Sequence, residues 1–170
     1  MREPEGFREF VQARYPALVR LGALLTGDPG LGEDLVQTAL MKTFRAWRRI
    51  TPDGDAEAYT RTVMARAAWK ERRRRWHGEV PTAELPEIGH DGPYDRLDQA
   101  DAVNRLLAGL PAQQRVVLTL RYWVGLTETE IAQALGCSPG TVKSRASRAL
   151  AALREHDALD DVRLNSGGRP

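Results

Sequence analysis

The sequence predicts an all-α protein of two small helical domains joined by a flexible acidic linker. Apolar residues recur at helical spacing over several long segments, and almost no segment shows the alternating β-branched pattern of a strand. Residues 78–93 contain three prolines and three glycines among acidic residues and show no apolar periodicity. A chain of 170 residues is long enough for two such domains, each only marginally stable alone.

Charge is divided between two neighbouring blocks near the expected domain boundary. Residues 61–76 contain seven basic residues and one acid, whereas residues 77–101 contain seven acids and one arginine. The formal net charge of +2 conceals this division because the two blocks cancel. We expect a first domain at residues 5–76, the linker at 77–95, a second domain at 96–155 and a tail at 156–170, of which residues 165–170 should fray.

The composition is that of a folded protein without an apolar segment of membrane-spanning length. Hydrophobic residues form 42% of the chain and charged residues 28%, and no stretch approaches the about 18 apolar residues that a bilayer requires. The first six residues lack an apolar signal core, so we expect a cytoplasmic protein. Cys137, the single cysteine, excludes an internal disulfide and a multi-cysteine zinc site, and we expect it to be a small buried side chain.

The first helix with a clear pattern covers residues 33–48. Its apolar side chains recur on one face, which we expect to be buried, and they are Leu35, Ala39, Leu40, Phe44 and Trp47. Glu33, Asp34 and Gln37 fall on the opposite, exposed face. Without further information, the residues favour a purely structural role for Glu33 and Asp34, because acidic side chains are common in the first turn of a helix, where they stabilise its positive N-terminus.

Residues 59–76 form a helical segment in which aromatic and basic side chains are interleaved. Unstacked bases stack on aromatic rings while basic groups neutralise the phosphates, so this pattern indicates single-stranded nucleic acid. The alternative is that Tyr59 and Trp69 are core residues and the arginine run a solvated helix end. For Trp69 the core is favoured, because large aromatic side chains are highly buried on average. For the arginines phosphate binding is favoured.

The second half begins with two helices that can be placed from capping chemistry. Pro111 falls at an expected first helical position, and Val116, Val117, Leu120 and Trp123 follow at helical spacing, so this helix should end near Trp123. Residues 127–130 read Thr-Glu-Thr-Glu, which is a capping box that opens a short helix. We expect the inward side chains of that short helix to be Ile131, Ala132 and Leu135.

A third helix then completes a helix-turn-helix. Gly136 can adopt the left-handed conformation that ends the short helix, and Ser138 followed by Pro139 starts the next one. Its expected apolar stripe is Val142, Ala146, Ala149, Leu150 and Leu153. Its outward face carries Thr141, Lys143, Ser144, Ser147 and Arg148. Short hydroxyl and basic side chains in the first turns of such a helix can contact base edges and phosphates in the major groove. The alternative is that this face is an ordinary solvated helix surface. The complete helix-turn-helix pattern favours DNA binding.

These residues resemble region 4 of the extracytoplasmic-function sigma factors of bacterial RNA polymerase. The resemblance lies in Leu-Pro-Ala-Gln-Gln-Arg-Val-Val-Leu at residues 110–118 and Gly-Cys-Ser-Pro-Gly-Thr-Val-Lys-Ser-Arg at residues 136–145. It implies that this half binds the β flap of the polymerase and the −35 promoter element, the latter through Thr141, Lys143, Ser144, Ser147 and Arg148. Output domains of response regulators are similar in this half, which by itself leaves both families open.

The first half resembles region 2 of the same sigma factors and decides between the two families. Residues 33–48 resemble region 2.2, which implies that Glu33, Asp34, Gln37 and Met41 bind the clamp helices of the polymerase β′ subunit. Residues 59–76 resemble regions 2.3 and 2.4, which with the preceding loop at 50–56 open the −10 element and hold a flipped base. The implied −10 residues are Tyr59, Arg61, Arg66, Trp69, Lys70, Arg72, Arg73, Arg74 and Arg75. Arg66 stands where many relatives have asparagine, which leaves the base preference of the pocket open.

The order region 2, linker, region 4 identifies the chain as a member of this family, with a resemblance to its actinobacterial sigma-E-like subfamily. Membership implies core RNA polymerase and promoter DNA as partners, and it makes an anti-sigma factor a candidate partner. The three histidines are scattered and no glycine-rich phosphate loop is present, so we expect no catalytic residue, cofactor, metal or small-molecule substrate. The alternatives are a stand-alone operator-binding regulator and a helical interaction module without DNA contact.

Overall fold

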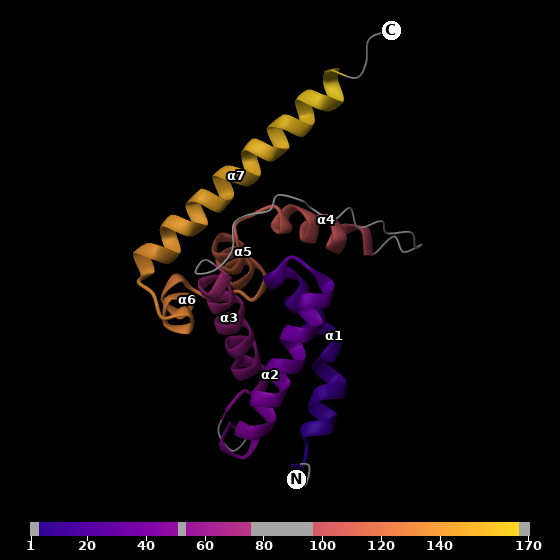
Figure 1. The fold of residues 1–170 in the computed structure, drawn as a ribbon, viewed down its shortest axis with the longest axis vertical. Coiled ribbons are helices and arrows are strands. Elements are labelled where there is room, and N and C mark those ends of the chain that lie inside the picture. Colours follow the sequence, from indigo (N-terminus) through magenta and orange to yellow (C-terminus); the bar gives the residue numbers. More distant parts are fainter. Residues whose placement is uncertain (1–3, 51–53, 76–96, 167–170) are drawn as a thin grey trace.

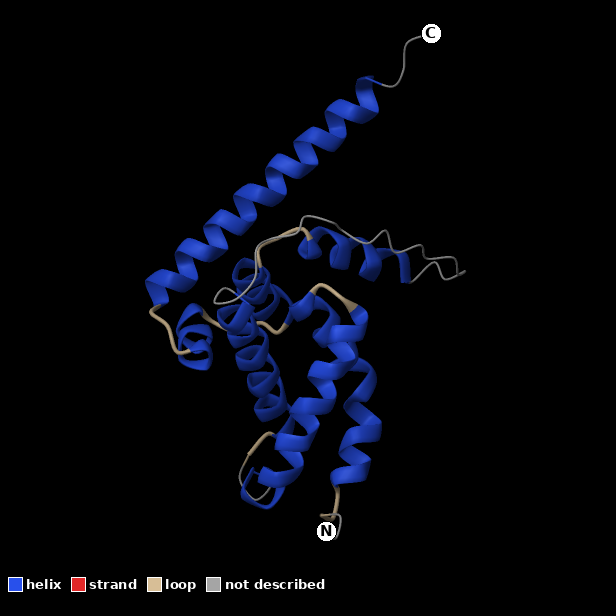
Figure 2. Ribbon diagram, viewed as in Figure 1, coloured by secondary structure: helices blue, strands red, loops and turns tan. Residues whose placement is uncertain are grey.

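The computed structural model describes residues 4–50, 54–75 and 97–166, in which the side chains of 71–75, 97–101 and 156–166 are not considered (Figure 1). These parts of the chain form seven α-helices and one π-helical turn, and Figure 2 shows helices joined by loops without a strand among them. The elements are α1 (Phe7–Thr26), α2 (Pro29–Ile50), α3 (Ala56–Arg75), α4 (Leu97–Ala108), α5 (Ala112–Leu118), η1 (Thr119–Trp123), α6 (Glu128–Leu135) and α7 (Pro139–Ser166). The predicted all-α class is confirmed, and the predicted linker at 77–95 lies outside the described residues.

Helices α1 and α2 form a tight antiparallel pair. Gly27 ends α1 at φ +78°, a left-handed conformation that favours glycine, and its N–H donates to the carbonyl of Ala23 at 2.7 Å. Gly22 and Gly32 lie where the two helices cross, because a Cβ atom on Gly22 would fall 2.5 Å from the carbonyl oxygen of Gly32. The absence of both side chains therefore allows the two backbones to approach.

Helix α2 is held on α1 and α3 by different chemistry at its two faces. The hydroxyls of Thr43 and Thr60 are fully buried and lie 2.9 Å apart between α2 and α3. At the other face, Phe7 of α1 meets Phe44 and Trp47 of α2 edge to face at 5.1 Å between ring centroids. The predicted buried stripe of α2 is confirmed, with Ala39 and Trp47 buried and Leu35, Leu40 and Phe44 half-buried.

The second half departs from the prediction at one turn. Val116, Val117 and Leu120 are buried as expected, but Pro111 is the residue that caps α5 and Trp123 is 51% exposed. The exposure of Trp123 is caused by η1. A π-helical turn holds more residues than an α-helical turn, so it rotates its last side chains out of the buried register. Trp123 is the last residue of η1, so the helical run ends there as predicted, although its side chain is exposed.

Helix α7 is longer than the predicted recognition helix. It begins at Pro139 as expected but continues to Ser166, beyond the predicted tail boundary and into the residues expected to fray. No proline or glycine occurs between residues 141 and 166, so no residue in that stretch ends the helix. Figure 1 shows its C-terminal part extending away from the other helices. Residues 167–170 of the predicted fraying segment lie outside the described residues.

The two halves, residues 4–75 and 97–166 as described, share one hydrophobic core. Leu18, Leu25 and Met64 of the first half belong to the same buried cluster as Val116 and Ile131 of the second. Helices α1 and α3 both contact α5, and α3 also contacts α6, as Figure 1 shows. The two predicted domains are thus packed against each other, a contact that the sequence did not predict. Among the described helices, none is long and apolar enough to span a membrane.

Candidate nucleic-acid interface

The helix-turn-helix begins with the predicted capping box at the start of α6. The Thr127 hydroxyl accepts a hydrogen bond from the backbone N–H of Glu130 at 3.2 Å, and the Glu130 carboxylate accepts one from the backbone N–H of Thr127 at 2.7 Å. The N–H and hydroxyl of Thr127 stabilise the ionised carboxylate and hold the pKa of Glu130 below its ordinary value. Ile131, Ala132 and Leu135 are buried, which confirms the predicted inward face of α6.

The turn between α6 and α7 has the predicted geometry. Gly136 ends α6 at φ +69°, and its N–H donates to the carbonyl of Ala132 at 2.9 Å. The Ser138 hydroxyl then accepts a hydrogen bond from the backbone N–H of Thr141 at 3.1 Å, which caps the first turn of α7. Cys137 is half-buried in this turn, and burial raises the pKa of its thiol. This side chain packs against the core, which agrees with the structural role expected for it.

The first turns of α7 present a polar and basic face. Val142, Ala146 and Ala149 are buried against the core, and Leu150 and Leu153 are half-buried. The exposed side chains of the opposite face are Lys143, Ser144, Ser147 and Arg148. Thr141 differs from them because it is half-buried and its hydroxyl lies 2.9 Å from that of Ser138. The surface offered to a major groove therefore consists of two cations and two hydroxyls, and its contact with DNA stays a prediction.

The exposed face of α2 carries the four residues expected to bind polymerase. Glu33, Asp34, Gln37 and Met41 are all exposed, and Met41 is 59% exposed although it is apolar. Leu31, three residues before Asp34, is also exposed at 46% and was not part of the expected surface. An apolar side chain one turn before the acids was the available signal. Exposed apolar side chains on either side of two exposed acids suit a protein partner, and this role stays a prediction.

The predicted −10 residues of α3 lie in different environments. Arg66 and Lys70 are exposed, whereas Tyr59, Arg61 and Trp69 are half-buried. The backbone of α3 continues to Arg75, so the basic run is helical, but the side chains of Arg72, Arg73, Arg74 and Arg75 lie outside the described residues. Residues 51–53 of the loop expected to hold the flipped base also lie outside them.

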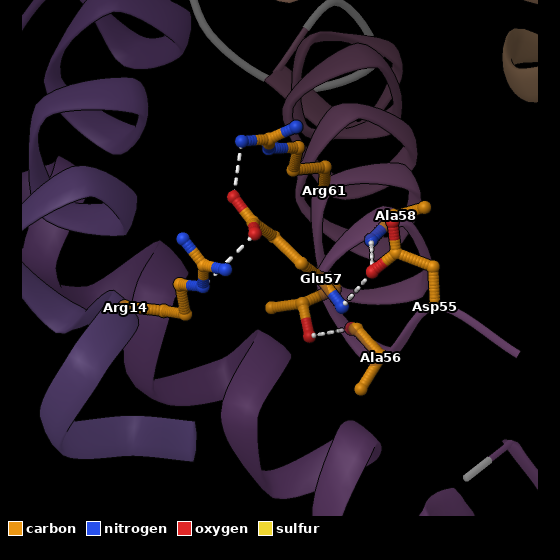
Figure 3. Close-up of polar contacts among 7 residues, drawn as sticks. Arg14, Asp55, Ala56, Glu57, Ala58 and Arg61 are labelled. Carbon is orange, nitrogen blue, oxygen red and sulfur yellow. Dashed lines mark hydrogen bonds and ion pairs between the residues drawn. The ribbon is translucent and has the colours of Figure 1, made fainter. Parts of the chain in front are cut away.

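The first turn of α3 is tied to α1 by an ion-pair network that the sequence reading missed (Figure 3). The Glu57 carboxylate binds Arg14 of α1 at 3.0 Å and pairs with Arg61 one turn along α3. The Asp55 carboxylate caps the helix by accepting hydrogen bonds from the backbone N–H groups of Glu57 and Ala58. The spacing of four residues between Glu57 and Arg61 could have predicted their ion pair on one helix face. The pair with Arg14 could not be predicted in this way, because Arg14 is distant in sequence.

Two predicted −10 residues contact the helix-turn-helix of the same chain. Arg66 donates from Nε to the carbonyl of Ala134 in α6 at 2.6 Å. The Arg145 guanidinium of α7 lies over the ring of Trp69, 5.2 Å from its centroid. Trp69 packs against the shared core, in agreement with the favoured interpretation of its burial. Neither contact had a sequence signal, because the pairs come from opposite halves of the chain.

A second arginine contact involves exposed aromatic side chains at the start of the helix-turn-helix. Arg121 pairs with Glu128, which raises the pKa of the guanidinium, and it lies over the Tyr122 ring, 5.8 Å from the ring centroid. Tyr122 and Trp123 are 63% and 51% exposed. Among the described residues, no group of three or more His, Cys, Asp or Glu side chains is placed to hold a metal ion.

Comparison with known proteins finds similarity over both halves. The family described as Sigma-70 region 2 matches residues 10–78, and the family described as Sigma-70, region 4 matches residues 100–153. The RNA polymerase sigma-E factor of Streptomyces coelicolor is 41% identical over 162 residues, which cover 95% of this chain and 92% of that protein. The ECF RNA polymerase sigma factor SigL of Mycobacterium tuberculosis is 37% identical over 149 residues, covering 81% of this chain and 80% of that protein.

Solved structures share the same fold. The sigma factor RpoE of Bartonella quintana, in complex with the anti-sigma factor NepR, is 26% identical and superimposes with a TM-score of 0.62. That alignment covers 89% of this chain and 96% of the other. CnrH, in complex with the cytosolic domain of CnrY, is 22% identical with a TM-score of 0.56, covering 92% of this chain and 88% of the other.

Proposed function

The chain belongs to the sigma-70 family of RNA polymerase sigma factors, and on this premise we propose which of its residues direct transcription initiation. It is a promoter-directing sigma factor of the extracytoplasmic-function type, a role that requires core RNA polymerase and promoter DNA as partners. Sigma factors of this family are transcription initiation factors. We further propose that the chain is not an enzyme, that the polymerase performs the nucleotidyl transfer, and that the protein acts in the cytoplasm.

The proposed −35 reader is the exposed face of α7, and this face is the observation that carries the proposal. Lys143 and Arg148 are exposed on a helix that follows a complete capping box and a left-handed glycine turn. A helix in this setting can lie in the major groove, where Lys143 and Arg148 reach base edges or phosphates and the hydroxyls of Ser144 and Ser147 donate or accept hydrogen bonds. Thr141 is proposed as a supporting residue, since its hydroxyl also meets Ser138.

The proposed −10 surface is the α3 helix with the loop before it. Exposed Arg66 and Lys70, together with the arginines at 72–75, supply positive charge for the phosphates of an opened strand. Tyr59 and Trp69 are proposed as stacking surfaces for unpaired bases. The half-buried Arg61 already pairs with Glu57, so its proposed part is to add charge near the start of α3.

The proposed polymerase contacts lie on both halves. The exposed side chains Glu33, Asp34, Gln37 and Met41 on α2 are proposed to bind the β′ clamp helices, and the second half is proposed to bind the β flap. An anti-sigma factor is a further proposed partner, supported by the RpoE relative, whose solved structure is a complex with NepR. The two predicted domains, 5–76 and 96–155, are proposed as the units that divide these tasks.

Run-off transcription tests the proposal most directly. Fragmented genomic DNA of the source organism is transcribed by sigma-free core polymerase, with and without the protein. We expect discrete new transcripts whose upstream sequences share two spaced elements. If no new transcript appears and the protein binds duplex DNA equally well without polymerase, the chain acts instead as an operator-binding regulator.

A further inference from the structure

The first turn of α3 carries an ion-pair network in which one carboxylate serves two arginines (Figure 3). Glu57 binds Nε of Arg14 on α1 at 3.0 Å, and its other carboxylate oxygen pairs with Arg61, one turn further along α3. The side chain of Glu57 is only 14% exposed, whereas those of Arg14 and Arg61 are 53% and 38% exposed. A shielded acid therefore lies between two cations that an approaching strand can reach.

The backbone of this turn is fixed independently of the arginines. The N–H of Glu57 donates to the Asp55 carboxylate that caps α3, at 2.8 Å. Three residues further on, the buried Thr60 hydroxyl lies 2.9 Å from that of Thr43 on α2. The position of Glu57 is thus set by the helix and its neighbours, so any rearrangement of the network is confined to the long arginine side chains.

Arg61 cannot serve Glu57 and a phosphate equally well. It is one of the residues proposed to bind the opened strand, and a phosphate binds best to two parallel N–H groups of one guanidinium. Glu57 already engages one Nη group of Arg61, and its negative charge opposes that of a phosphate. If Arg61 left without a replacement, the largely buried Glu57 carboxylate would lose its counter-charge, which is costly.

Arg14 is placed to remove that cost. It binds the other oxygen of the same carboxylate and comes from a different helix, so Glu57 keeps a cationic partner when Arg61 turns away. Without Arg14, the whole charge of Glu57 would act on Arg61 and hold it on α3. The affinity of Arg61 for a phosphate should therefore depend on a residue of α1.

We propose that Arg14 and Glu57 are positioning residues for the opened strand. Glu57 holds the Arg61 guanidinium beside α3, and Arg14 retains Glu57 when Arg61 is transferred to a phosphate of the single strand. This inference rests on the proposed −10 role of Arg61 and extends the −10 surface to α1. Loss of Arg14 traps Arg61 on Glu57, whereas loss of the Glu57 charge frees it. A network that only packed α3 on α1 would be weakened alike by either loss.

The test measures binding of a fluorescein-labelled, random-sequence 12-nucleotide single strand to the full chain, by anisotropy at several salt concentrations. We expect Arg14→Gln to weaken binding about two- to fivefold, the range of one exposed ion pair. That loss should exceed the loss in Arg20→Gln, which removes the same charge from an exposed position of α1. Glu57→Gln should strengthen binding more than Glu9→Gln, which removes an exposed acid of α1. Arg14→Lys keeps a cation for Glu57 and should restore binding.

The decisive measurement is the coupling between Arg14 and Arg61. Arg61→Gln should weaken binding and reduce the salt slope by about 0.7, the value for one phosphate of a single strand. In the Arg14→Gln background the same substitution should have little further effect, because Arg61 is already held by Glu57. In the Glu57→Gln background, Arg14→Gln should weaken binding no more than Arg20→Gln does.

Two outcomes overturn the proposal while leaving the −10 role of Arg61 intact. One is additive losses in Arg14→Gln and Arg61→Gln, and the other is a loss of binding in Glu57→Gln that equals the loss in Arg14→Gln. If Arg61→Gln binds the strand as tightly as the wild type, the −10 role of Arg61 is refuted together with the proposal. All variants are assayed at a temperature at which denaturant unfolding shows them to be folded. Run-off transcription with the wild-type chain reports separately on the sigma-factor role.

Discussion

Individual polar side chains of this chain fall into those that build the fold and those that are exposed for a partner. Thr127, Glu130 and Ser138 have their hydrogen bonds within the two helix caps. Lys143 and Arg148 are exposed on the helix that these caps position. A substitution in the first group should lower the stability of the fold, whereas one in the second should alter only what the fold binds.

The first residue-scale prediction concerns the cations of α7. We expect Lys143→Ala and Arg148→Ala each to weaken promoter use about five- to hundredfold, the range of one lost base or phosphate contact. Run-off transcription measures the effect, and co-purification with core polymerase should be unchanged. Arg154→Ala, an exposed arginine of the same helix, is the matched control. Loss of polymerase binding in K143A or R148A would count against a role confined to DNA.

The second prediction concerns the acidic face of α2. Asp34→Arg should reduce the affinity for core polymerase at least tenfold, because it places a cation where an exposed acid faces the partner. Pull-down with core polymerase, repeated at two salt concentrations, measures the change. Glu155→Arg makes the same change of charge at an exposed position of α7 and should bind core polymerase as tightly as the wild type. If D34R binds as tightly as the wild type, Asp34 lies outside the interface.

The third prediction concerns the capping box and its pH dependence. Thr127→Ala should lower the free energy of unfolding by about 1 kcal/mol at neutral pH, because it removes the hydroxyl that caps α6. The pKa of Glu130 is lower in the folded chain, so its ionised form stabilises the fold above the ordinary glutamate pKa, and this contribution is lost as the pH falls through the folded value. Denaturant unfolding from neutral to acidic pH should show the difference between wild type and Glu130→Gln shrinking with falling pH. A difference that grows on acidification would contradict the assigned direction.

The distance between packed helices, and which of their side chains are buried, each depend on a few residues in this chain. The crossing of α1 and α2 depends on Gly22 and Gly32, and the exposure of Trp123 depends on the π-helical turn that ends at this residue. Both features are local in sequence, but their effects appear only where one helix meets another. The exposed Tyr122 and Trp123 follow directly from that shift in register.

The element-scale prediction uses two helical glycines with opposite surroundings. Gly22→Ala should destabilise the fold by about 1–3 kcal/mol, because its methyl group meets the backbone of Gly32, which cannot rotate away. Gly140→Ala is the matched control, since its methyl group would meet only the Ser138 hydroxyl at 3.8 Å. That variant should gain about 0.5–1 kcal/mol from helix propensity. Equal unfolding midpoints for the two variants would show that the crossing can widen without cost.

The whole molecule is one packed unit in the described residues, although its sequence has the organisation of two. The shared core contains residues from α1 and α3 together with residues from α5, α6 and α7. Each half alone would leave part of that apolar surface in water. Packing of the halves therefore stabilises both, and it also places the proposed −10 and −35 surfaces in contact.

The whole-molecule prediction is a single unfolding transition. Scanning calorimetry of the wild type should give equal calorimetric and van't Hoff enthalpies, because the halves share a core. Arg115→Gln should lower the midpoint, with a loss of about 2 kcal/mol, since a charged donor to the Leu25 carbonyl is removed from the interface. Two separated transitions in the wild type would show that the halves unfold independently.

The sequence by itself determined the helical class, the helix-turn-helix and the exposed faces of α2 and α7. These features depend on periodicity and capping, which are set by residues at most a few positions apart. The Thr127 capping box, the Gly136 turn and the buried Val142 stripe were all predicted in this way and are confirmed.

Only the tertiary structure decided how the two halves meet. The contacts of Arg66 with Ala134, Arg145 with Trp69 and Arg115 with Leu25 join residues far apart in the chain. Periodicity places a residue on a face of its own helix but does not say which other helix covers that face. The partner is selected by the packing of complete apolar surfaces against one another, a property of the folded chain and not of any short segment.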